Sequence, residues 1–148
     1  MLGLKILNGR EIRDVLDLIE SQWGAEMKID GALLQNNKGR IFLVNREISK
    51  IDLSKLRINS IGMYFCEIEK GIRLSIEGSQ IVGPKSNKNV VEINEDQAKS
   101  WMKGEDLSIE GDYSGFVIIK NKNDFLGTGK YKDGTILNYV GKERRVNS

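Results

Sequence analysis

The sequence contains no histidine and only one cysteine, Cys66, among its 148 residues. The absence of histidine excludes histidine-based acid–base catalysis, Ser–His or Cys–His activation of a nucleophile, and histidine ligation of a metal. One cysteine can form neither an internal disulfide nor a zinc site of the usual Cys/His kind. The remaining candidate groups, Asp, Glu, Lys and Tyr, show no catalytic spacing. We therefore expect a protein that is not an enzyme and that holds no metal and no cofactor.

Long hydrophobic runs are also missing. The longest apolar stretches are far shorter than the roughly 18 residues that a membrane-spanning helix needs. The first five residues lead directly into a charged helical pattern, which is not typical of a signal peptide. A single cysteine fits a reducing compartment. We expect a cytoplasmic protein without a membrane partner.

Proline is as scarce as cysteine. Pro84 is the only one, and it opens the polar stretch 84–89, which has no hydrophobic periodicity. Such a stretch is typical of a boundary between two structural units. We expect a mixed α/β domain over residues 1–84 and a small β-rich domain over residues 88–148, which together give an α+β protein.

Hydrophobic spacing predicts a helix near the start of the chain. Asn8 and Glu11 have the spacing of a capping box, apolar residues then recur at helical intervals, and Gly24 ends the pattern. Alternating patterns and turn residues predict two β-hairpins after this helix. The predicted strands are 32–34, 40–44, 58–67 and 72–76, and two short helical segments are predicted at 45–51 and 77–82.

The part after Pro84 is predicted to be mainly β-structure. A helix over 95–102 is capped by Asn94 and stopped by Gly104, and strands follow at 116–120, 125–131 and 135–139. This part has too few residues for a parallel sheet with crossovers, and it has the content of a small, closed or partly closed barrel.

The net charge of +2 hides a separation of charge along the chain. Residues 89–112 hold two Lys and seven Asp/Glu, a net of −5, whereas residues 120–148 hold seven Lys/Arg and three Asp/Glu, a net of +4. A small β-rich unit with one basic face is a candidate nucleic-acid surface.

Several segments of the second part resemble a PUA domain, the RNA-binding pseudobarrel found appended to pseudouridine synthases and archaeosine transglycosylases. The closer likeness is to the C-terminal domain of the bacterial 5-methylcytosine rRNA methyltransferases of the Nol/Nop/Sun group, in which a hydrophobic strand, a Leu-Gly-x-Gly turn and a Lys/Arg-rich ending close the chain. The segments that carry the likeness are 91–93, Ala98, 103–104, 115–119, 126–130 and 138–145.

The first part resembles the pre-PUA half of small large-subunit assembly factors of the Nip-seven type, through segments 39–46, 61–65 and 73–76. The two resemblances together cover residues 39–146. A chain of 148 residues leaves no room for the cofactor-binding body of the methyltransferases, and their two catalytic cysteines have no counterpart. The resemblance therefore implies an RNA-binding partner or assembly factor that does not methylate.

The basic C-terminal region and the resemblance indicate the same candidate residues. Lysine and arginine neutralise phosphates, arginine also forks to bases, and tyrosine rings beside them can stack on unpaired bases. The candidate RNA-binding residues are Lys103, Lys130, Tyr131, Lys132, Lys142, Arg144 and Arg145. For the basic end the alternative is a solvated terminal strand, and for Tyr131 a core position is equally compatible with the pattern.

Three further features are predicted to be structural. Tyr139 alternates with Thr135 and Leu137 and is expected in the core, and Cys66 is expected to be buried in a strand. Gly127 and Gly129 invite a phosphate-loop interpretation, but no helix pattern follows them. We expect them to form a bulge or a close backbone approach at a barrel corner.

Two functions fit these observations. The preferred one is binding of structured RNA, either rRNA or tRNA, in ribosome biogenesis, rRNA processing or RNA modification. The alternative is a protein-interaction adaptor for an RNA methyltransferase or a ribosome assembly factor, which the modest net charge favours. The adaptor would expose an apolar patch, whereas an RNA-binding surface would be continuously cationic.

Overall fold

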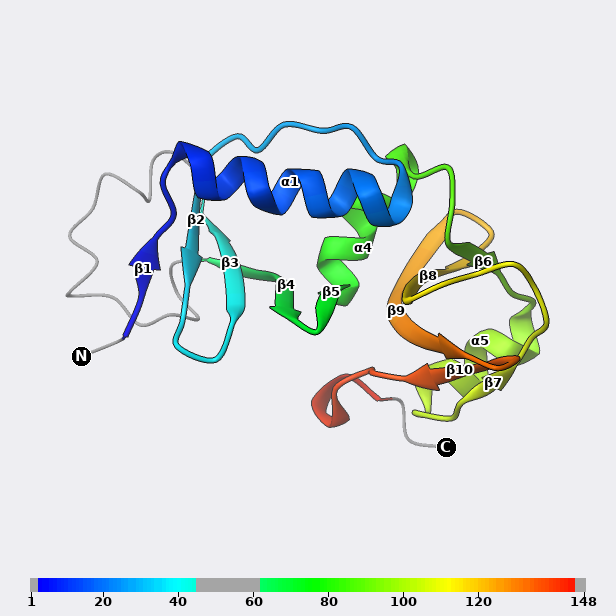
Figure 1. The fold of residues 1–148 in the computed structure, drawn as a ribbon. Helices are drawn as coiled ribbons and strands as arrows, with labels where there is room; N and C mark the ends of the chain where they lie inside the picture. The colour runs from blue at the N-terminus through cyan, green and yellow to red at the C-terminus, as the bar shows by residue number, and fades with distance from the viewer. Residues whose placement is uncertain (1–2, 45–61, 146–148) are drawn as a thin grey trace.

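The computed structural model describes residues 3–44 and 62–145. These residues form two five-stranded sheets that follow one another along the chain, with helices packed beside them (Figure 1). The strand orders are β1-β2-β3-β4-β5 and β6-β8-β9-β10-β7. The expected α+β class is confirmed.

Helix α1 (Gly9–Trp23) lies across the top of the molecule and reaches from the first sheet toward the second (Figure 1). Asn8 and Glu11 form the predicted capping box, and Gly24 ends the helix with a φ of 72°. One face of α1 is buried because apolar residues recur on it at helical spacing. Its last residue, Trp23, is fully buried.

The first sheet is antiparallel throughout. Both predicted hairpins are present, although the last strand ends earlier than expected and the sequence did not predict the two-residue β1. The strands are β1 (Lys5–Ile6), β2 (Ala32–Gln35), β3 (Arg40–Val44), β4 (Met63–Glu69) and β5 (Gly71–Leu74). The helix predicted at 45–51 and the start of the strand predicted at 58–67 lie outside the described residues.

Two short helical elements connect the sheets. Ser75 caps α4 (Ile76–Val82), which confirms the helical turn predicted at 77–82. Pro84 lies in the 3₁₀ turn η2 (Gly83–Lys85) that follows. No helix among residues 3–44 and 62–145 is long and apolar enough to cross a membrane.

The second sheet is curled, with the long strand β9 bending around its side (Figure 1), and it matches the expected partly closed barrel. Strand β6 pairs in parallel with β8, and the other pairs are antiparallel. The predicted helix and three strands are present, whereas β7 was not predicted. The elements are β6 (Val90–Glu92), α5 (Glu95–Met102), β7 (Leu107–Ser108), β8 (Phe116–Asn121), β9 (Asp124–Lys132), β10 (Thr135–Asn138) and the 3₁₀ turn η3 (Lys142–Arg144).

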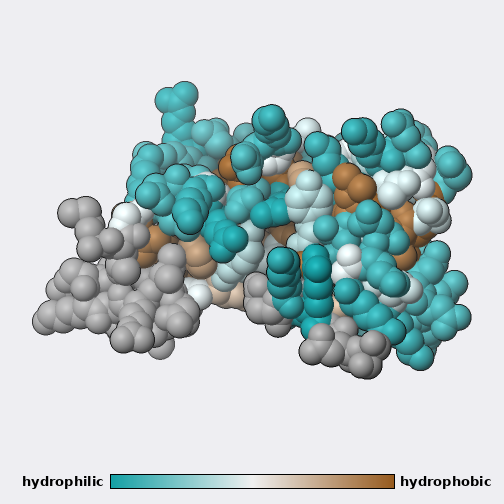
Figure 2. Space-filling view, turned by 90° about the horizontal axis from the view of Figure 1, so that it is seen from below, coloured by the Kyte–Doolittle hydropathy of each residue, from teal (hydrophilic) through white to brown (hydrophobic). Residues whose placement is uncertain are grey.

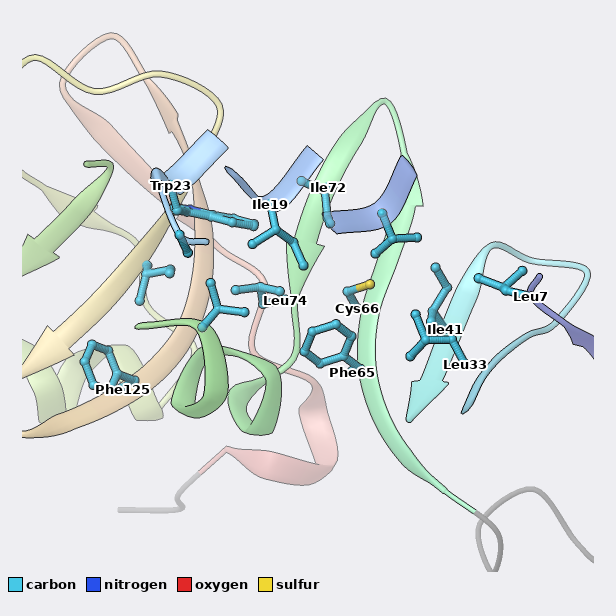
Figure 3. Packing of buried hydrophobic residues seen from close by; sticks show 14 residues of the cluster. Leu7, Ile19, Trp23, Leu33, Ile41, Phe65, Cys66, Ile72, Leu74 and Phe125 are labelled. Carbon is cyan, nitrogen blue, oxygen red and sulfur yellow. The ribbon is translucent and has the colours of Figure 1, made fainter. Parts of the chain in front are cut away.

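The buried side chains form two clusters. The first lies under α1 and continues into Ile118 and Phe125 of the second sheet. Figure 3 shows this cluster as a row from Leu7 at one end to Trp23 and Phe125 at the other. The second cluster surrounds Trp101. Because the first cluster contains side chains from both sheets, the sheets pack against each other. The division into domains 1–84 and 88–148 stays a prediction.

The expected core position of Tyr139 is wrong. Its side chain is 41% exposed, whereas Ile136 is fully buried. In the sequence 135–139, either the odd-numbered or the even-numbered residues could face the core. In the structure Ile136 points inward, close to Gly129. Asn138 is fixed on that side too, since its side-chain amide donates to the carbonyls of Trp101 and Glu105.

Gly129 allows a close approach at the centre of the second sheet, as predicted for this glycine. A Cβ at this position would lie 2.4 Å from the Trp101 ring and 2.6 Å from the Leu137 carbonyl. We therefore expect Gly129→Ala to lower the free energy of unfolding by roughly 1–3 kcal/mol, because the packed core cannot accept the methyl group without strain. Urea unfolding followed by fluorescence measures this change.

Gly9→Ala is the matched control. A Cβ there meets nothing within 4 Å, so this variant should be as stable as the parent or slightly more stable. Equal stability of the two variants would contradict the close approach at Gly129.

Cys66 is buried, as expected, and burial raises the pKa of its thiol to about 12. The thiolate is the reactive species, so Cys66 should be nearly inert toward a thiol reagent in the folded protein. Labelling should become complete once the protein is unfolded in denaturant. Rapid stoichiometric labelling of the native protein would show that the thiol is accessible.

Candidate nucleic-acid interface

The two sheets are joined by hydrogen bonds between residues far apart in the sequence. The hydroxyl of Thr128 on β9 donates to the Leu74 carbonyl at 3.0 Å and accepts from the Leu74 N–H at 3.2 Å. The Ser79 hydroxyl on α4 accepts from the Gly127 N–H at 2.9 Å. Both hydroxyls are buried. Because buried polar groups are costly to leave unpaired, these bonds hold β5 and α4 in a fixed position against β9.

The end of α1 adds a second connection. The Trp23 indole N–H and the Gln22 side-chain amide both donate to the Phe116 carbonyl on β8, at 3.0 Å and 2.7 Å. Helix α1 is thus tied to β8, in addition to the bonds that join β5 and α4 to β9.

A cleft of about 300 Å³ lies along this joint. We call it the junction cleft. The charged and aromatic side chains that line it are Arg40, Tyr64, Arg73, Glu77, Tyr139 and Arg144. An adjoining hollow of about 240 Å³ shares Arg73 and Tyr139 with the cleft and adds Lys70, Phe116 and Lys130.

Two arginines of the cleft share one carboxylate. Arg40, Glu67 and Arg73 are register partners across β3, β4 and β5. Glu67 accepts from Arg40 Nε at 3.2 Å and from an Arg73 terminal nitrogen at 2.7 Å. One carboxylate cannot neutralise two guanidinium groups, so this row of three side chains keeps a net positive charge.

Each of these two arginines also lies over a tyrosine ring. The Arg40 guanidinium carbon is 5.3 Å from the Tyr64 ring centroid, and that of Arg73 is 4.9 Å from the Tyr139 centroid. The Phe116 ring meets Tyr139 edge to face, with centroids 5.1 Å apart. Cation–π and edge-to-face contacts of this kind restrain the rings they join. Tyr139 is therefore held in place although it is exposed.

Arg144 closes another side of the cleft by pairing with Glu77. Its two terminal nitrogens reach the two carboxylate oxygens at 2.9 Å and 2.8 Å. The hydrogen bond from Arg144 holds the pKa of the Glu77 carboxyl below its ordinary value of 4.5. Glu77 is therefore ionised at neutral pH and offsets part of the cationic charge.

The cleft and the hollow together are cationic. Their lining holds five cations, Arg40, Lys70, Arg73, Lys130 and Arg144, and three carboxylates, Glu67, Glu69 and Glu77, a net of +2. The net charge of the whole chain is also +2, so the positive charge is locally concentrated here.

The structure divides the candidate residues predicted from the sequence into separate groups. Arg144 lies in the cleft and Lys130 in the adjoining hollow. Lys132 and Lys142 are exposed. Arg145 packs against Gly104, since a Cβ on that glycine would lie 2.5 Å from Arg145 Nε, and this brings Arg145 to the end of α5 that Lys103 caps.

Tyr131 takes part in packing. Its hydroxyl donates to the Gly111 carbonyl at 3.1 Å, and its ring meets Tyr113 edge to face with centroids 5.5 Å apart. It is half-buried against the cluster around Trp101. A stacking role for Tyr131 toward RNA stays a prediction.

The sequence interpretation did not identify Arg40, Tyr64, Arg73 and Tyr139 as a site. The pairing of Arg73 with Glu67 could have been predicted from the second hairpin, because the turn sets which residues face each other. The approach of Tyr139 to Arg73 could not have been predicted, because it depends on how the two sheets pack. Among the described residues, no group of three or more Cys, Asp or Glu side chains is placed to hold a metal ion.

Comparison with known proteins identifies the second part of the chain. Residues 88–146 match a family model described as the methyltransferase RsmF PUA domain. A ribosomal RNA small subunit methyltransferase F from Aeromonas salmonicida is 27% identical over 139 residues, which cover 93% of this chain and 28% of that protein. The protein of the same name from Vibrio cholerae is 31% identical over 93 residues, 62% of this chain and 20% of that protein. The chain thus spans less than a third of these curated relatives.

A solved structure also resembles the whole described fold. It is a conserved PUA domain protein from Thermoplasma acidophilum, with a TM-score of 0.60, 13% sequence identity and 95% coverage of both chains. At this identity the likeness shows the fold alone. The expected PUA-like pseudobarrel, resembling the C-terminal domain of Sun-type methyltransferases, is confirmed. The likeness of the first part to Nip-seven-type factors stays a prediction.

The pairing of Glu77 with Arg144 predicts a pH-dependent contribution to stability. Because the folded-state pKa of Glu77 is lowered, its contribution is present above the ordinary value of 4.5 and is lost as the pH falls through the folded-state pKa. Glu77→Gln should lower the free energy of unfolding at neutral pH by less than about 1 kcal/mol, because the pair is partly exposed. Urea unfolding at neutral pH and in acid measures the difference, which should shrink in acid.

Arg144→Gln provides the control background. Without the Arg144 guanidinium, the effect of Glu77→Gln on stability should depend less on pH, because the largest cause of the lowered Glu77 pKa is removed. If the difference in the free energy of unfolding between the parent protein and Glu77→Gln were as large in acid as at neutral pH, this result would argue against the ion pair.

Proposed function

We propose that this chain, whose residues 88–146 form a PUA domain, binds structured RNA, either rRNA or tRNA, in ribosome biogenesis, rRNA processing or RNA modification. The observation that carries the proposal is the match of these residues to the PUA domain of an enzyme named for its action on ribosomal RNA. The chain would act in the cytoplasm, without a membrane partner.

The cationic side chains supply the physical mechanism. Lysine and arginine that neutralise phosphates release condensed counterions, so that binding weakens as the salt concentration rises. The proposed phosphate contacts are Lys103, Lys130, Lys132, Lys142, Arg144 and Arg145. Those at the end of α5 and those around the junction cleft would contact separate parts of an RNA stem.

The proposal includes no catalytic step. The chain covers 28% or less of the methyltransferases it resembles. Its only cysteine is buried, and the raised pKa of Cys66 keeps the thiol protonated and unsuited to nucleophilic attack. Binding alone accounts for the features that support the proposal.

One observation favours the alternative, an adaptor for an RNA methyltransferase or a ribosome assembly factor. A hollow of about 430 Å³ beside α5 is lined mainly by the apolar side chains of Ala98, Met102 and Leu126. Such a surface could receive an apolar side chain of a protein partner. On the face drawn in Figure 2, however, hydrophilic residues prevail and apolar residues form small, separate areas. RNA binding remains the preferred proposal.

Titration of the protein with tRNA and with rRNA fragments at several salt concentrations tests the proposal. We expect a complex whose affinity falls steeply with salt. Lys132→Glu and Lys142→Glu should each weaken it and reduce the salt slope, since each removes a phosphate contact.

Lys38→Glu is the matched control, because it makes the same charge change at an exposed residue in the turn between β2 and β3. The absence of any salt-sensitive complex would refute RNA binding. The adaptor would be supported if the protein formed no salt-sensitive RNA complex but captured a methyltransferase or an assembly factor, and if this capture persisted after nuclease treatment.

A further inference from the structure

We infer that the junction cleft binds one unpaired nucleotide of the RNA, with its base on the Tyr139 ring and its phosphate on the guanidinium groups of Arg40 and Arg73. This inference rests on the proposed RNA-binding function and adds a specific subsite to it. The subsite combines Tyr139, which follows β10, with two arginines of the first sheet that lie outside the basic end of the chain on which the sequence interpretation relied.

The guanidinium groups of Arg40 and Arg73 have N–H donors that are not engaged in hydrogen bonds. Each arginine carries five N–H donors in a planar fork. The guanidinium groups of Arg40 and Arg73 each use one nitrogen on Glu67, and within the described part of the chain neither guanidinium group shows another hydrogen-bond partner. Both line the cleft, so their remaining N–H groups can fork to phosphate oxygens. Stacking on Tyr64 and Tyr139 restrains them before a ligand arrives, which lowers the entropy lost on binding.

Tyr139 supplies the surface for the base. Among residues 3–44 and 62–145 it is one of three large apolar side chains that are exposed, and the only aromatic one of these three. It lines both the cleft and the adjoining hollow, and Phe116 and Arg73 restrain its ring. A restrained, exposed ring beside cationic groups is the arrangement on which unpaired bases stack. Its exposure contradicts a purely structural role in the core.

The size and charge of the cleft favour a single nucleotide. A volume of about 300 Å³ is at the lower end of small-molecule sites, which measure roughly 300–1,000 Å³. A base within a duplex is stacked on its neighbours and cannot reach the Tyr139 ring. Glu77 and Arg144 balance each other's charge, whereas Arg40, Glu67 and Arg73 keep a net positive charge, so the phosphate is directed toward Arg40 and Arg73.

Two RNAs that differ only in one feature test the inference. The first is a blunt RNA hairpin, and the second is the same hairpin with a short single-stranded tail. We expect the parent protein to bind the tailed hairpin roughly tenfold more tightly, as one aromatic stacking contact would provide. Tyr139→Leu and Arg73→Lys should abolish this gain and leave the affinity for the blunt hairpin unchanged.

Two further variants separate the subsite from general electrostatics. Tyr139→Phe keeps the ring and should retain the gain from the tail. Lys132→Glu should weaken binding of both hairpins by the same factor. A fluorescent adenine analogue placed in the tail provides an independent signal, because stacking on Tyr139 should quench it in the parent protein and not in Tyr139→Leu.

The possible failures are distinguishable. If neither hairpin binds, the proposed RNA-binding function itself is wrong. If both bind with equal affinity, or if the gain survives in either Tyr139→Leu or Arg73→Lys, the subsite is wrong and RNA binding stands. If a free nucleoside monophosphate binds the protein more tightly than the tailed hairpin does, the cleft is a site for free nucleotide and the assignment to RNA is overturned.

Discussion

The candidate site depends on one buried joint, the pair of hydrogen bonds between Thr128 and Leu74. Thr128 places β9 against β5, so the two backbone groups of Leu74, at the end of β5, are satisfied by a side chain of the other sheet. Both residues are buried, so a shift that broke these bonds without admitting water would leave polar groups without partners in an apolar environment. Phe125 of the same strand packs into the core beneath α1, so hydrophobic burial acts in the same direction. The rim of the cleft is consequently fixed by the core.

This joint holds a small excess of positive charge in a defined place. A net charge of +2 spread over a whole surface would attract an anion weakly, because exposed charges are screened within about 10 Å at ordinary salt. Here Arg40 and Arg73 converge on one carboxylate, and each guanidinium is restrained by a tyrosine ring. Two cations with one counter-ion in a concave site leave an unbalanced charge where an anion can approach closely. Position, more than total charge, makes this surface favourable for an anion.

The sequence predicted the local structure well because local rules governed it. Both long helices begin at asparagine caps with a capping box, and both hairpins were visible from alternation and turn residues. Strands β1 and β7 have two residues each, too short for any periodic signal. Tyr139 was assigned to the wrong face because alternation defines two faces of a strand without saying which one is buried. The cleft itself was not predictable, because Arg40 reaches it through a register shift in the β3–β4 pair next to Ile41, and Tyr139 reaches it through the packing of two sheets.

The cleft also bears on which part of the chain forms a functional unit. The family match covers residues 88–146, which include Tyr139 and Arg144 but neither Arg40, Tyr64 nor Arg73. A PUA domain taken alone would therefore hold the stacking ring and lack the two arginines that receive the phosphate. The alignment with the Aeromonas salmonicida enzyme covers 93% of this chain, so the similarity extends over both sheets, as does the shared fold with the archaeal PUA domain protein. If the cleft binds a nucleotide, the first sheet is a part of the binding surface and the two sheets must be retained together for RNA recognition.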